Sequence, residues 1–471
     1  IDLQNVVVLD AGSLGITVGS GSTVTGHDVV VRGTRPDSTG RFGTGIQVIN
    51  GGVLDLSRTA VVGNTSAGIL AGYTGTSLTL TDSAIRGTLP KPDDDSGHGV
   101  DAGMGPHVTL TRVVIQENHM SGVVAHDALT VVEMTDCVVS DTQPRQTNLT
   151  QGVGINAHVD ATVIMERVLV EQSREIGVIV LRAATVSLTD VVVRDTLPRE
   201  LDAMFGRGIN AQSRSHVDGT RVLIARSHEV GLFLSEVSGS WEDLTIVDTE
   251  PRESDLDSGR GVQISDASTI ELERVTLERN TDIGMMLVDA GTSASIWDLA
   301  VRDTRCEPTT GRFGHGLQVI MGAEATIERA LFEDNKEASV LVGGGGALLS
   351  MSHLTVQRTL EADCSTGDCV DEGGGMGVVT IGGGHADVSS FIVTANALCG
   401  ISLATGGDST GTPFTIAGVM DLHNGVVSNQ PIGANVQAEG FDFDRLTDGV
   451  LYFDNGTNLD TSVLPVPGTG L

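Results

Sequence analysis

Apolar and polar residues alternate along this chain in short runs, and the runs return at regular intervals. Each interval opens with glycine followed by an apolar, a polar and an apolar residue, as in residues 154–157, and two further alternating runs follow, around Val163 and around Val168. Such runs predict short β-strands with one buried face, and a regular step predicts stacked repeats. The tetrad glycines, about 23 and about 31 residues apart in alternation, are Gly45, Gly68, Gly99, Gly122, Gly154, Gly177, Gly208, Gly231, Gly261, Gly284 and Gly316.

A column of short polar residues marks the end of each step. The residues three and five positions earlier form the last apolar run, as Val191 and Val193 do before Thr196. Such side chains tolerate tight turns and can bond along a stack. Threonine marks the longer steps and asparagine or serine the shorter ones, so the true repeat spans two steps. The column comprises Thr34, Asn64, Thr88, Asn118, Thr142, Ser173, Thr196, Ser227, Thr249, Asn280, Thr304, Asn335, Thr359 and Asn396.

Together, the runs and the column predict an all-β fold. We expect a single parallel β-helix, or solenoid, of about 15 coils in which narrow and wide coils alternate. The β-helix is expected over residues 1–430, and a final coil with an aromatic cap over residues 431–471. The first residues already follow the pattern of the last strand of a coil. We therefore expect an N-terminal cap or further coils ahead of them.

The stretch GINAHVDATVIMERVLVEQS, residues 154–173, carries a family resemblance together with the polar column. It resembles the right-handed parallel β-helix repeat proteins of the secreted and cell-surface type, the pectate-lyase-like group. The resemblance implies a right-handed coil and a secreted or outer cell-surface location. It does not specify an activity, because this fold carries lyases, hydrolases, epimerases, adhesins and structural rods.

Composition and charge narrow the range of partners. The 61 glycines suit a β-structure that is dense in turns. The formal net charge of −33 argues against nucleic acid and against anionic lipid as partners. A membrane-spanning helix would need a run of about 18 apolar residues, and the sequence contains none, so we expect no membrane span.

The additional residues of the wide coils all leave at one corner, directly after the threonine of the polar column. Most of these inserts begin with a proline two residues after the threonine and end with a glycine, which suits a fixed exit and a sharp return. Loops on a rigid scaffold are common binding surfaces, but matching loops can also simply pack on one another. The inserts are residues 35–44, 89–98, 143–153, 197–207, 250–260, 305–315 and 360–376.

Two residues after each tetrad glycine, side chains should point away from the core. Wide coils carry polar residues there, whereas narrow coils carry apolar ones, from Leu70 to Leu341. An outward apolar column is unusual unless it is covered. Either the inserts fold over it and bond the amides, or it stays open as a groove for an extended ligand, with His126 and His158 at its edge. The candidate binding residues are Gln47, Asp101, Asn156, His158, Asn210, Gln263 and Gln318, with the insert cations Arg145, Arg199 and Arg252.

Carboxylates in the inserts supply the candidate catalytic and metal chemistry. Paired carboxylates can hydrolyse a glycosidic bond, and clustered ones can hold Ca²⁺. The expected cofactor is therefore none, or Ca²⁺. No cluster has the spacing of a calcium loop, and the aromatic residues that would stack on sugars are few and scattered. The catalytic candidates are Asp368, Asp371 and Glu372, and the metal candidates are Asp93, Asp94, Asp95, Asp255 and Asp257.

The five cysteines divide into two groups. Cys137 and Cys399 occupy positions that are apolar in other coils, so we expect them to be buried. Cys306, Cys364 and Cys369 lie in neighbouring inserts, where one disulfide is expected in an oxidising compartment, with Cys364–Cys369 as the first choice. A zinc site is the alternative.

These patterns favour a non-catalytic secreted or cell-surface scaffold with a structural, adhesive or ligand-presenting role through its stacked inserts. The expected partner is a polysaccharide or another surface protein. Two alternatives stay open. One is a polysaccharide lyase or glycoside hydrolase acting near the 360–376 insert, and the other is a fibre subunit that associates with itself through the N-terminal end.

Overall fold

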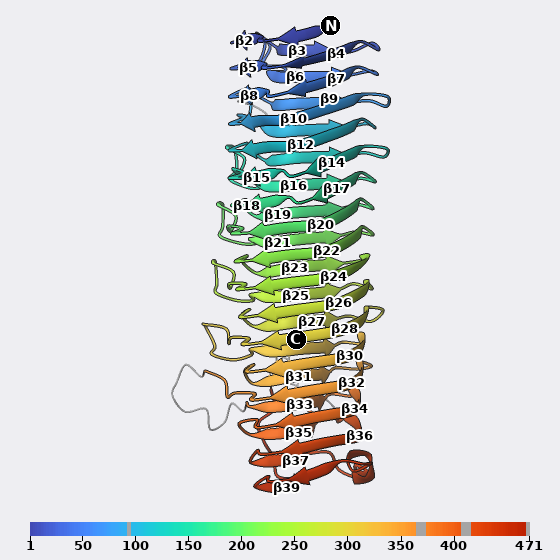
Figure 1. Ribbon diagram of the computed structural model, residues 1–471. Helices are drawn as coiled ribbons and strands as arrows, with labels where there is room; N and C mark the ends of the chain where they lie inside the picture. The colour runs from blue at the N-terminus through green and yellow to red at the C-terminus, as the bar shows by residue number, and fades with distance from the viewer. Residues whose placement is uncertain (92–95, 364–373, 407–415, 468–471) are drawn as a thin grey trace. The chain divides into compact units, whose positions relative to one another are not determined.

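A computed structural model describes residues 1–91, 96–363, 374–406 and 416–467. The chain divides into two compact units, Ile1–His228 (unit 1) and Glu229–Leu471 (unit 2). Within each unit, a coil contributes one strand to a first sheet, called sheet I here, and either one long strand or two short strands to a second sheet, called sheet II (Figure 1).

Unit 1 is built from the following strands. Sheet I contains β3 (Leu14–Val18), β6 (Thr44–Ile49), β9 (Ala67–Gly72), β11 (His98–Gly103), β13 (Ser121–His126), β16 (Val153–His158), β19 (Ile176–Leu181) and β21 (Arg207–Gln212). Sheet II contains β1 (Asp2–Gln4), β2 (Val7–Leu9), β4 (Thr23–His27), β5 (Val30–Arg32), β7 (Val53–Ser57), β8 (Ala60–Val62), β10 (Ser77–Arg86), β12 (His107–Gln116), β14 (Val131–Thr135), β15 (Val138–Ser140), β17 (Thr162–Glu166), β18 (Leu169–Glu171), β20 (Thr185–Arg194) and β22 (His216–Ala225).

Unit 2 repeats this plan and adds a short 3₁₀ helix, η2 (Phe443–Leu446). Sheet I contains β23 (Val230–Ser235), β25 (Arg260–Ser265), β27 (Ile283–Val288), β29 (His315–Ile320), β31 (Ala338–Gly343), β33 (Met376–Ile381), β35 (Cys399–Ala404), β37 (Ile432–Val436) and β39 (Thr457–Asp460). Sheet II contains β24 (Ser238–Val247), β26 (Thr269–Glu278), β28 (Ser293–Arg302), β30 (Glu324–Glu333), β32 (Leu348–Gln357), β34 (His385–Thr394), β36 (Val419–Ser428) and β38 (Leu451–Phe453).

Neighbouring strands pair in parallel and keep the register that the sequence predicts. In unit 1, Gln47 of β6 lies opposite Leu70 of β9, which lies opposite Asp101 of β11. In unit 2, Met286 of β27 lies opposite Gln318 of β29 in the same way. This stacking confirms the prediction of a right-handed parallel β-helix.

In many coils, the second and third apolar runs form one continuous strand, where the sequence predicts two separate strands. In β20 they form one strand, which bends at Asp190, a residue with φ of 55°. The bend reverses the alternation once, so that Leu188 and Val191 both stay buried in the core. In other coils, such as β14 and β15, the bend separates two short strands.

The polar column forms a ladder of buried hydrogen bonds at one corner. The Asn335 Oδ1 accepts from the Thr304 backbone N–H at 3.2 Å and from the Thr304 hydroxyl at 2.7 Å, and its Nδ2 donates to the Val301 carbonyl at 3.1 Å. Asn118 bonds Thr88 and Ile85 in the same manner in unit 1. These contacts confirm bonding along the stack for the asparagines of the column, whereas among the described residues most threonine and serine hydroxyls of the column, such as those of Thr88 and Ser173, have no hydrogen-bond partner.

A second column, which the sequence reading missed, lies at the bend of sheet II. It alternates aspartate and arginine six residues before the ladder positions from Thr34 to Asn335, and its members have positive φ. In unit 1, the Arg112 guanidinium forms two hydrogen bonds with Asp82, at 2.5 and 3.0 Å, and in unit 2 Arg329 binds Asp298 at 2.6 and 2.8 Å. These exposed pairs link each wide coil to the narrow coil that follows.

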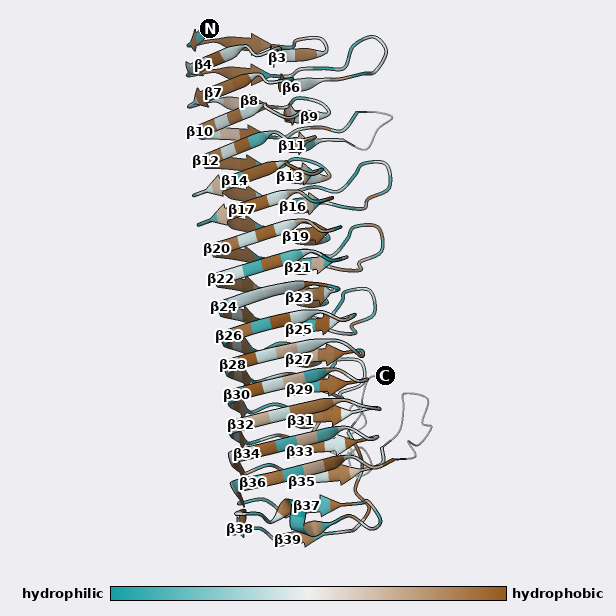
Figure 2. Ribbon diagram, turned by 90° about the vertical axis from the view of Figure 1, so that its right-hand side faces the viewer, coloured by the Kyte–Doolittle hydropathy of each residue, from teal (hydrophilic) through white to brown (hydrophobic). Residues whose placement is uncertain are grey.

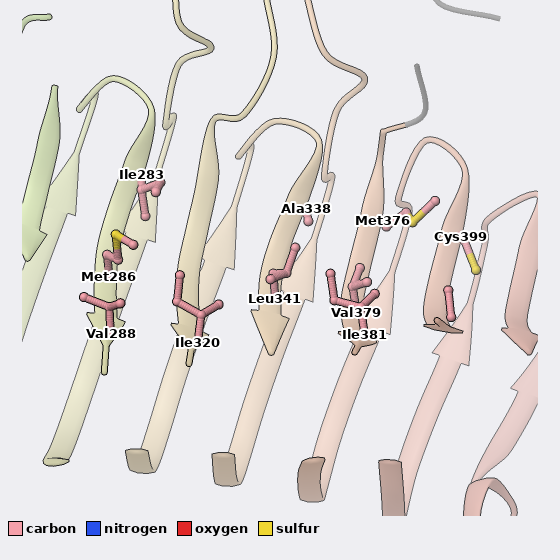
Figure 3. Packing of buried hydrophobic residues seen from close by; sticks show 11 residues of the cluster. Ile283, Met286, Val288, Ile320, Ala338, Leu341, Met376, Val379, Ile381 and Cys399 are labelled. Atoms are coloured by element: carbon pink, nitrogen blue, oxygen red, sulfur yellow. The ribbon is translucent and has the colours of Figure 1, made fainter. Parts of the chain in front are cut away.

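The outward apolar residues of sheet I are half-buried in part of unit 1 and at Phe233 of β23 in unit 2, and they are enclosed from β27 onward. In β27, Met285 and Leu287 point into the core, so alternation places Met286 and Val288 on the outer face. There they belong to an outer apolar cluster that continues through the later strands of unit 2, shown in Figure 3. In unit 1, the corresponding Leu70 of β9 and Ile179 of β19 are only half-buried. The outer apolar cluster consists of Ile283, Met286, Val288, Ile320, Ala338, Leu341, Met376, Val379, Ile381, Cys399 and Ala404.

The last coil of unit 2 continues the stack. β37 pairs with β35, and β39 pairs with β37, both in parallel. Leu446 of η2 is fully buried, and the Tyr452 hydroxyl donates to its carbonyl at 2.9 Å. Phe443 and Phe453 lie at the surface.

Candidate functional site

An open, mixed polar and apolar column runs along the outer face of sheet I in unit 1. Its members are in register from strand to strand, so that Asp101 lies opposite Val124, and Val124 lies opposite Asn156. Gln47, Asp101 and Asn156 are half-buried rather than enclosed. The structure therefore brings three of the predicted binding residues onto one accessible surface.

A hollow of about 290 Å³ opens over β6, β9, β11 and β13 on this face. Leu70 and Ile49 are among its apolar lining, and Gln47 and Asp101 among its polar lining. Tyr73 and Met104 also line it, and about half of each side chain is exposed, at 47% and 52%. Convergent polar groups beside exposed apolar ones are the usual composition of a ligand site. We call this surface the unit 1 groove.

Two histidines form the polar edge of the unit 1 groove. The His126 Nε2 lies 3.2 Å from an Asp101 oxygen, and its Nδ1 lies 2.9 Å from an Asp127 oxygen. The His158 ring stacks on His126 at 5.5 Å between centroids, and its Nδ1 lies 3.1 Å from the Asn156 Oδ1. The sequence had placed both histidines at the edge of this column.

The environment moves the two imidazole pKa values in opposite directions. The hydrogen bond that the His126 imidazolium donates to Asp101 raises the pKa of His126 above its ordinary value, and Asp127 adds to this. Burial lowers the pKa of His158, and the charge of His126 lowers it further. Burial opposes ionisation of Asp101, but the His126 hydrogen bond together with the charges of His98, His126 and His158 lowers the pKa of Asp101. His126 is therefore the more basic of the two imidazoles at the groove edge.

Replacing Asp101 by asparagine is expected to lower the pKa of His126. The folded-state pKa of His126 is raised, so its ion pair stabilises the fold below the ordinary value of 6.5. That contribution is lost as the pH rises through the folded-state value. A histidine proton titration by NMR measures the shift. Asp127→Asn should give a smaller shift, and His423, whose pKa is raised by Asp448, serves as the unaffected reference. An unchanged His126 titration in Asp101→Asn would contradict the assignment.

The other predicted binding amides bond side chains of their own strands. The Asn210 Oδ1 accepts from Arg207 at 2.9 Å, and the Gln263 Oε1 accepts from Arg260 at 3.0 Å. The Gln318 Nε2 donates to the His315 Nδ1 at 2.6 Å. Arg207, Arg260 and His315 are the last residues of their inserts, so these three amides bond the insert through its side chains rather than through its backbone. Asn210 and Gln318 are also fully buried, which removes them from any accessible surface.

The predicted insert cations hold the inserts in place. Arg199 binds Asp202 of its own insert at 2.6 Å and lies 3.7 Å from the half-buried Glu175. Arg252 repeats this in unit 2 with Asp255, at 2.7 Å, and Glu229, at 3.5 Å. The Arg145 backbone N–H closes its insert by donating to the Thr150 carbonyl at 2.9 Å. Arg199 and Arg252 are therefore structural in this geometry, since their guanidinium groups face carboxylates of the protein itself.

Inserts of neighbouring wide coils also contact one another. In unit 1, the Leu201 N–H donates to the Leu149 carbonyl at 3.1 Å. Figure 2 shows the inserts of each unit leaving the coils along one edge. They do not fully cover the column beside them, because Leu70 and Ile179 remain half-buried, although Val124 is 4% exposed. The predicted covering role is thus incomplete in unit 1.

The structure describes only some of the residues predicted to bind a metal, act in catalysis or form a disulfide. Asp255 and Asp257 both face the Arg252 guanidinium, at 2.7 and 3.6 Å, so a calcium ion would compete there with a fixed cation. Among the residues that the structure describes, no group of three or more His, Cys, Asp and Glu side chains is arranged to hold a metal ion. The predictions for Asp93, Asp94, Asp95, Asp368, Asp371, Glu372, Cys364 and Cys369 lie outside the described residues.

The remaining cysteines are buried thiols. Cys137 and Cys399 are almost fully buried, as predicted. Cys306 is also a free, buried thiol, and its sulfur accepts a hydrogen bond from the Asp363 N–H at 3.4 Å. Burial raises the pKa of the Cys306 thiol to about 12, which makes it unreactive at neutral pH.

A larger hollow, of about 510 Å³, lies over sheet II of unit 2 between β24 and β32. Its charged lining belongs to the aspartate and arginine column, including Arg274 with Asp243 and Arg329 with Asp298. Because these side chains already neutralise one another in two-point contacts, the hollow offers little unsatisfied chemistry. The smaller unit 1 groove is therefore the better candidate site.

In the described parts of the chain, no helix has the length and apolar character needed to cross a membrane.

Comparisons with known proteins add the following. No protein-family model matches the sequence, and no curated protein matches it. Among solved structures, the chain is similar to pectate lyase Pel9A, with 9% identity and a TM-score of 0.39 over 66% of this chain and 72% of that one. It is also similar to AlyGC, a PL6 family alginate lyase, with 7% identity and a TM-score of 0.18 over 97% of both chains. These likenesses are too distant to carry an activity to this chain.

Proposed function

We propose that this protein is a non-catalytic β-helical binding scaffold of the secreted or cell-surface type. Its contact surface is the unit 1 groove, and its role is adhesive or ligand-presenting. The observation that carries the proposal is the accessible, in-register column of Gln47, Leu70 and Asp101, flanked by the half-exposed Tyr73 and Met104. A rigid sheet face of this kind suits an extended ligand, because binding orders few groups of the protein.

The chemistry of the inserts supports a structural rather than a catalytic role for them. Arg199 and Arg252 bind carboxylates of their own inserts, and neighbouring inserts contact each other. Loops that satisfy one another have few free groups for a ligand. We therefore place the contact on the sheet face and not on the inserts, and the proposal requires no cofactor.

The Leu70→Asp variant is expected to lose ligand binding while it keeps the fold. Leu70 points outward and is half-buried in the groove, so a carboxylate there disrupts the contact surface without entering the core. Affinity electrophoresis and calorimetry with soluble neutral and acidic polysaccharides and with extended peptides measure binding. Leu348→Asp makes the same change at an exposed leucine of sheet II in unit 2 and should leave binding intact. Equal binding by both variants and the parent would contradict the proposal.

A polysaccharide lyase or glycoside hydrolase is the second candidate, and one observation favours it. His126 and His158 have pKa values shifted in opposite directions, as an acid and base pair would require. Incubation with uronate-containing polysaccharides, followed for unsaturated products and for new reducing ends, tests this candidate. Product formation that His126→Ala abolishes would replace the scaffold proposal with the lyase or hydrolase.

A further inference from the structure

Three places in the chain have the sequence Asn-x-Ser/Thr, in which x is not proline. They are Asn64-Thr65-Ser66, Asn148-Leu149-Thr150 and Asn455-Gly456-Thr457. This tripeptide is the acceptor for an N-linked glycan in secreted proteins. The tripeptide alone does not specify which asparagine is modified, because the side-chain nitrogen must also be accessible. The three sites differ in this respect.

Two of the three asparagines are occupied by bonds within the stack of coils. Asn64 is fully buried at the ladder corner of unit 1, where its Nδ2 donates to the Val31 carbonyl at 3.3 Å. Asn455 is half-buried in unit 2, and its Nδ2 donates to the Val427 carbonyl at 3.0 Å. The nitrogen that would bear a glycan is therefore engaged with the backbone in both cases. A glycan on Asn64 would also prevent the corner from closing, since the site has no access to solvent.

Asn148 is exposed in the middle of the 143–153 insert of unit 1. Its Oδ1 accepts from the Thr150 backbone N–H at 3.1 Å and from the Thr150 hydroxyl at 2.8 Å. Within the described residues, the Asn148 Nδ2 donates no hydrogen bond. The insert is closed behind it by the Arg145 N–H, which donates to the Thr150 carbonyl at 2.9 Å. The carboxamide is thus held by its oxygen, and its nitrogen stays accessible.

Apolar side chains beside Asn148 give a glycan a surface to cover. Leu149 and Leu201 are 39% and 55% exposed, and the Leu201 N–H donates to the Leu149 carbonyl at 3.1 Å, so the two residues are neighbours on adjacent inserts. Exposed apolar groups that lie together favour association with other molecules. A bulky, well-solvated glycan at Asn148 would lie next to them and oppose such contacts.

We propose that Asn148 is an N-glycosylation site and that Asn64 and Asn455 stay unmodified in the folded chain. The glycosyl donor is an oligosaccharide linked through pyrophosphate to a lipid. The Asn148 Nδ2 forms a bond to the anomeric carbon as the bond from that carbon to the pyrophosphate oxygen breaks. The bonding electrons leave with the pyrophosphate, and the amide gives up one proton. This inference goes beyond the proposed function and rests only on its secretory location, not on the unit 1 groove.

The test secretes the full chain from a eukaryotic cell behind a cleavable signal peptide. Peptide N-glycanase converts a glycosylated asparagine to aspartate, which peptide mass spectrometry then locates. We expect aspartate at position 148 and asparagine at positions 64 and 455. Asn148→Gln and Thr150→Ala should each abolish the glycan, whereas Thr150→Ser keeps the hydroxyl and should retain it.

Matched controls remove the other two acceptor sequences without changing their asparagines. Ser66→Gly deletes the hydroxyl of the first, and glycine tolerates the φ of 77° at this position. Thr457→Val deletes the hydroxyl of the third at an exposed residue. Both variants should be secreted with the same glycan as the parent chain.

Other outcomes overturn the inference. A secreted parent chain without a glycan, a glycan that persists in Asn148→Gln, or one that Ser66→Gly or Thr457→Val removes would each contradict it. Retention of an unglycosylated chain in the cell would contradict the secretory location itself. Ligand binding that requires Leu70 in a chain without a glycan would leave the proposed function standing, and a glycan at Asn148 on a chain that binds no ligand would leave only this inference standing.

Discussion

Replacing Asn335 by alanine is expected to lower the free energy of unfolding of unit 2 by roughly 2–5 kcal/mol. Asn335 is fully buried and bonds Thr304 and the Val301 carbonyl across the ladder corner. Alanine leaves the Thr304 N–H and the Val301 carbonyl without these partners where water cannot replace them. Trp241 and Trp297, the two tryptophans of the chain, both lie in unit 2, so fluorescence during denaturant unfolding reports its stability.

The ladder supplies its own controls for this prediction. Within the part of the chain that the structure describes, the buried Thr249 hydroxyl has no hydrogen-bond partner, whereas the Thr304 hydroxyl donates to Asn335. Thr249→Val should therefore be close to neutral, and Thr304→Val should cost about 1 kcal/mol. If Asn335→Ala unfolds at the same denaturant concentration as Thr249→Val, the ladder does not stabilise the corner as described.

Replacing Gly284 by alanine is the second large effect, with an expected loss of about 3 kcal/mol. A Cβ atom at this tetrad glycine would lie 2.5 Å from a Val301 methyl carbon and 2.6 Å from the Gly316 carbonyl oxygen of the next coil. Neither group can withdraw, because the first fills the core and the second belongs to the backbone of the stack. The tetrad glycine is therefore required by close approach between coils, which explains its recurrence in the sequence.

Gly345→Ala is the matched control for Gly284→Ala. A Cβ at Gly345 meets nothing within 4 Å, and its φ lies outside the left-handed region. Its unfolding midpoint should equal that of the parent chain in the same fluorescence experiment. A Gly284→Ala protein as stable as the Gly345→Ala protein would show that neighbouring coils are looser at this corner than the structure indicates.

Periodicity was sufficient to predict the architecture. The tetrad glycines recur because neighbouring coils approach closely there. The polar column recurs because its asparagines form hydrogen bonds along the stack. The aspartate and arginine column was equally available, since Asp82 and Arg112 stand six residues before Thr88 and Asn118. It was missed because charged residues are common at exposed positions, so their recurrence at a surface bend did not stand out in the sequence.

The candidate site was only partly predictable, for a physical reason. The alternation of amides and apolar residues continues through both units, yet Leu70 and Ile179 in unit 1 and Phe233 in unit 2 stay half-buried, whereas the outward residues from Met286 onward are enclosed. The difference in unit 2 includes Leu464 and Val466, which return from the end of the chain onto the outer apolar cluster. A local pattern records which way a side chain points, but not which distant segment covers it. The sequence also could not give the partners of Arg199 and Arg252, because Asp202 and Asp255 reach them only through the folding of each loop.

Hydroxyl-radical footprinting of the methionines tests the central claim most directly, namely that the outer face of sheet I is open at β9 and β11 in unit 1 and covered from β27 onward in unit 2. Met104 lines the unit 1 groove and is 52% exposed, whereas Met286 and Met376 of the outer apolar cluster are 5% and 0% exposed. The account predicts rapid oxidation of Met104 in the native chain and slow oxidation of Met286 and Met376 until unit 2 unfolds. Equal native rates for Met104 and Met286 would contradict it.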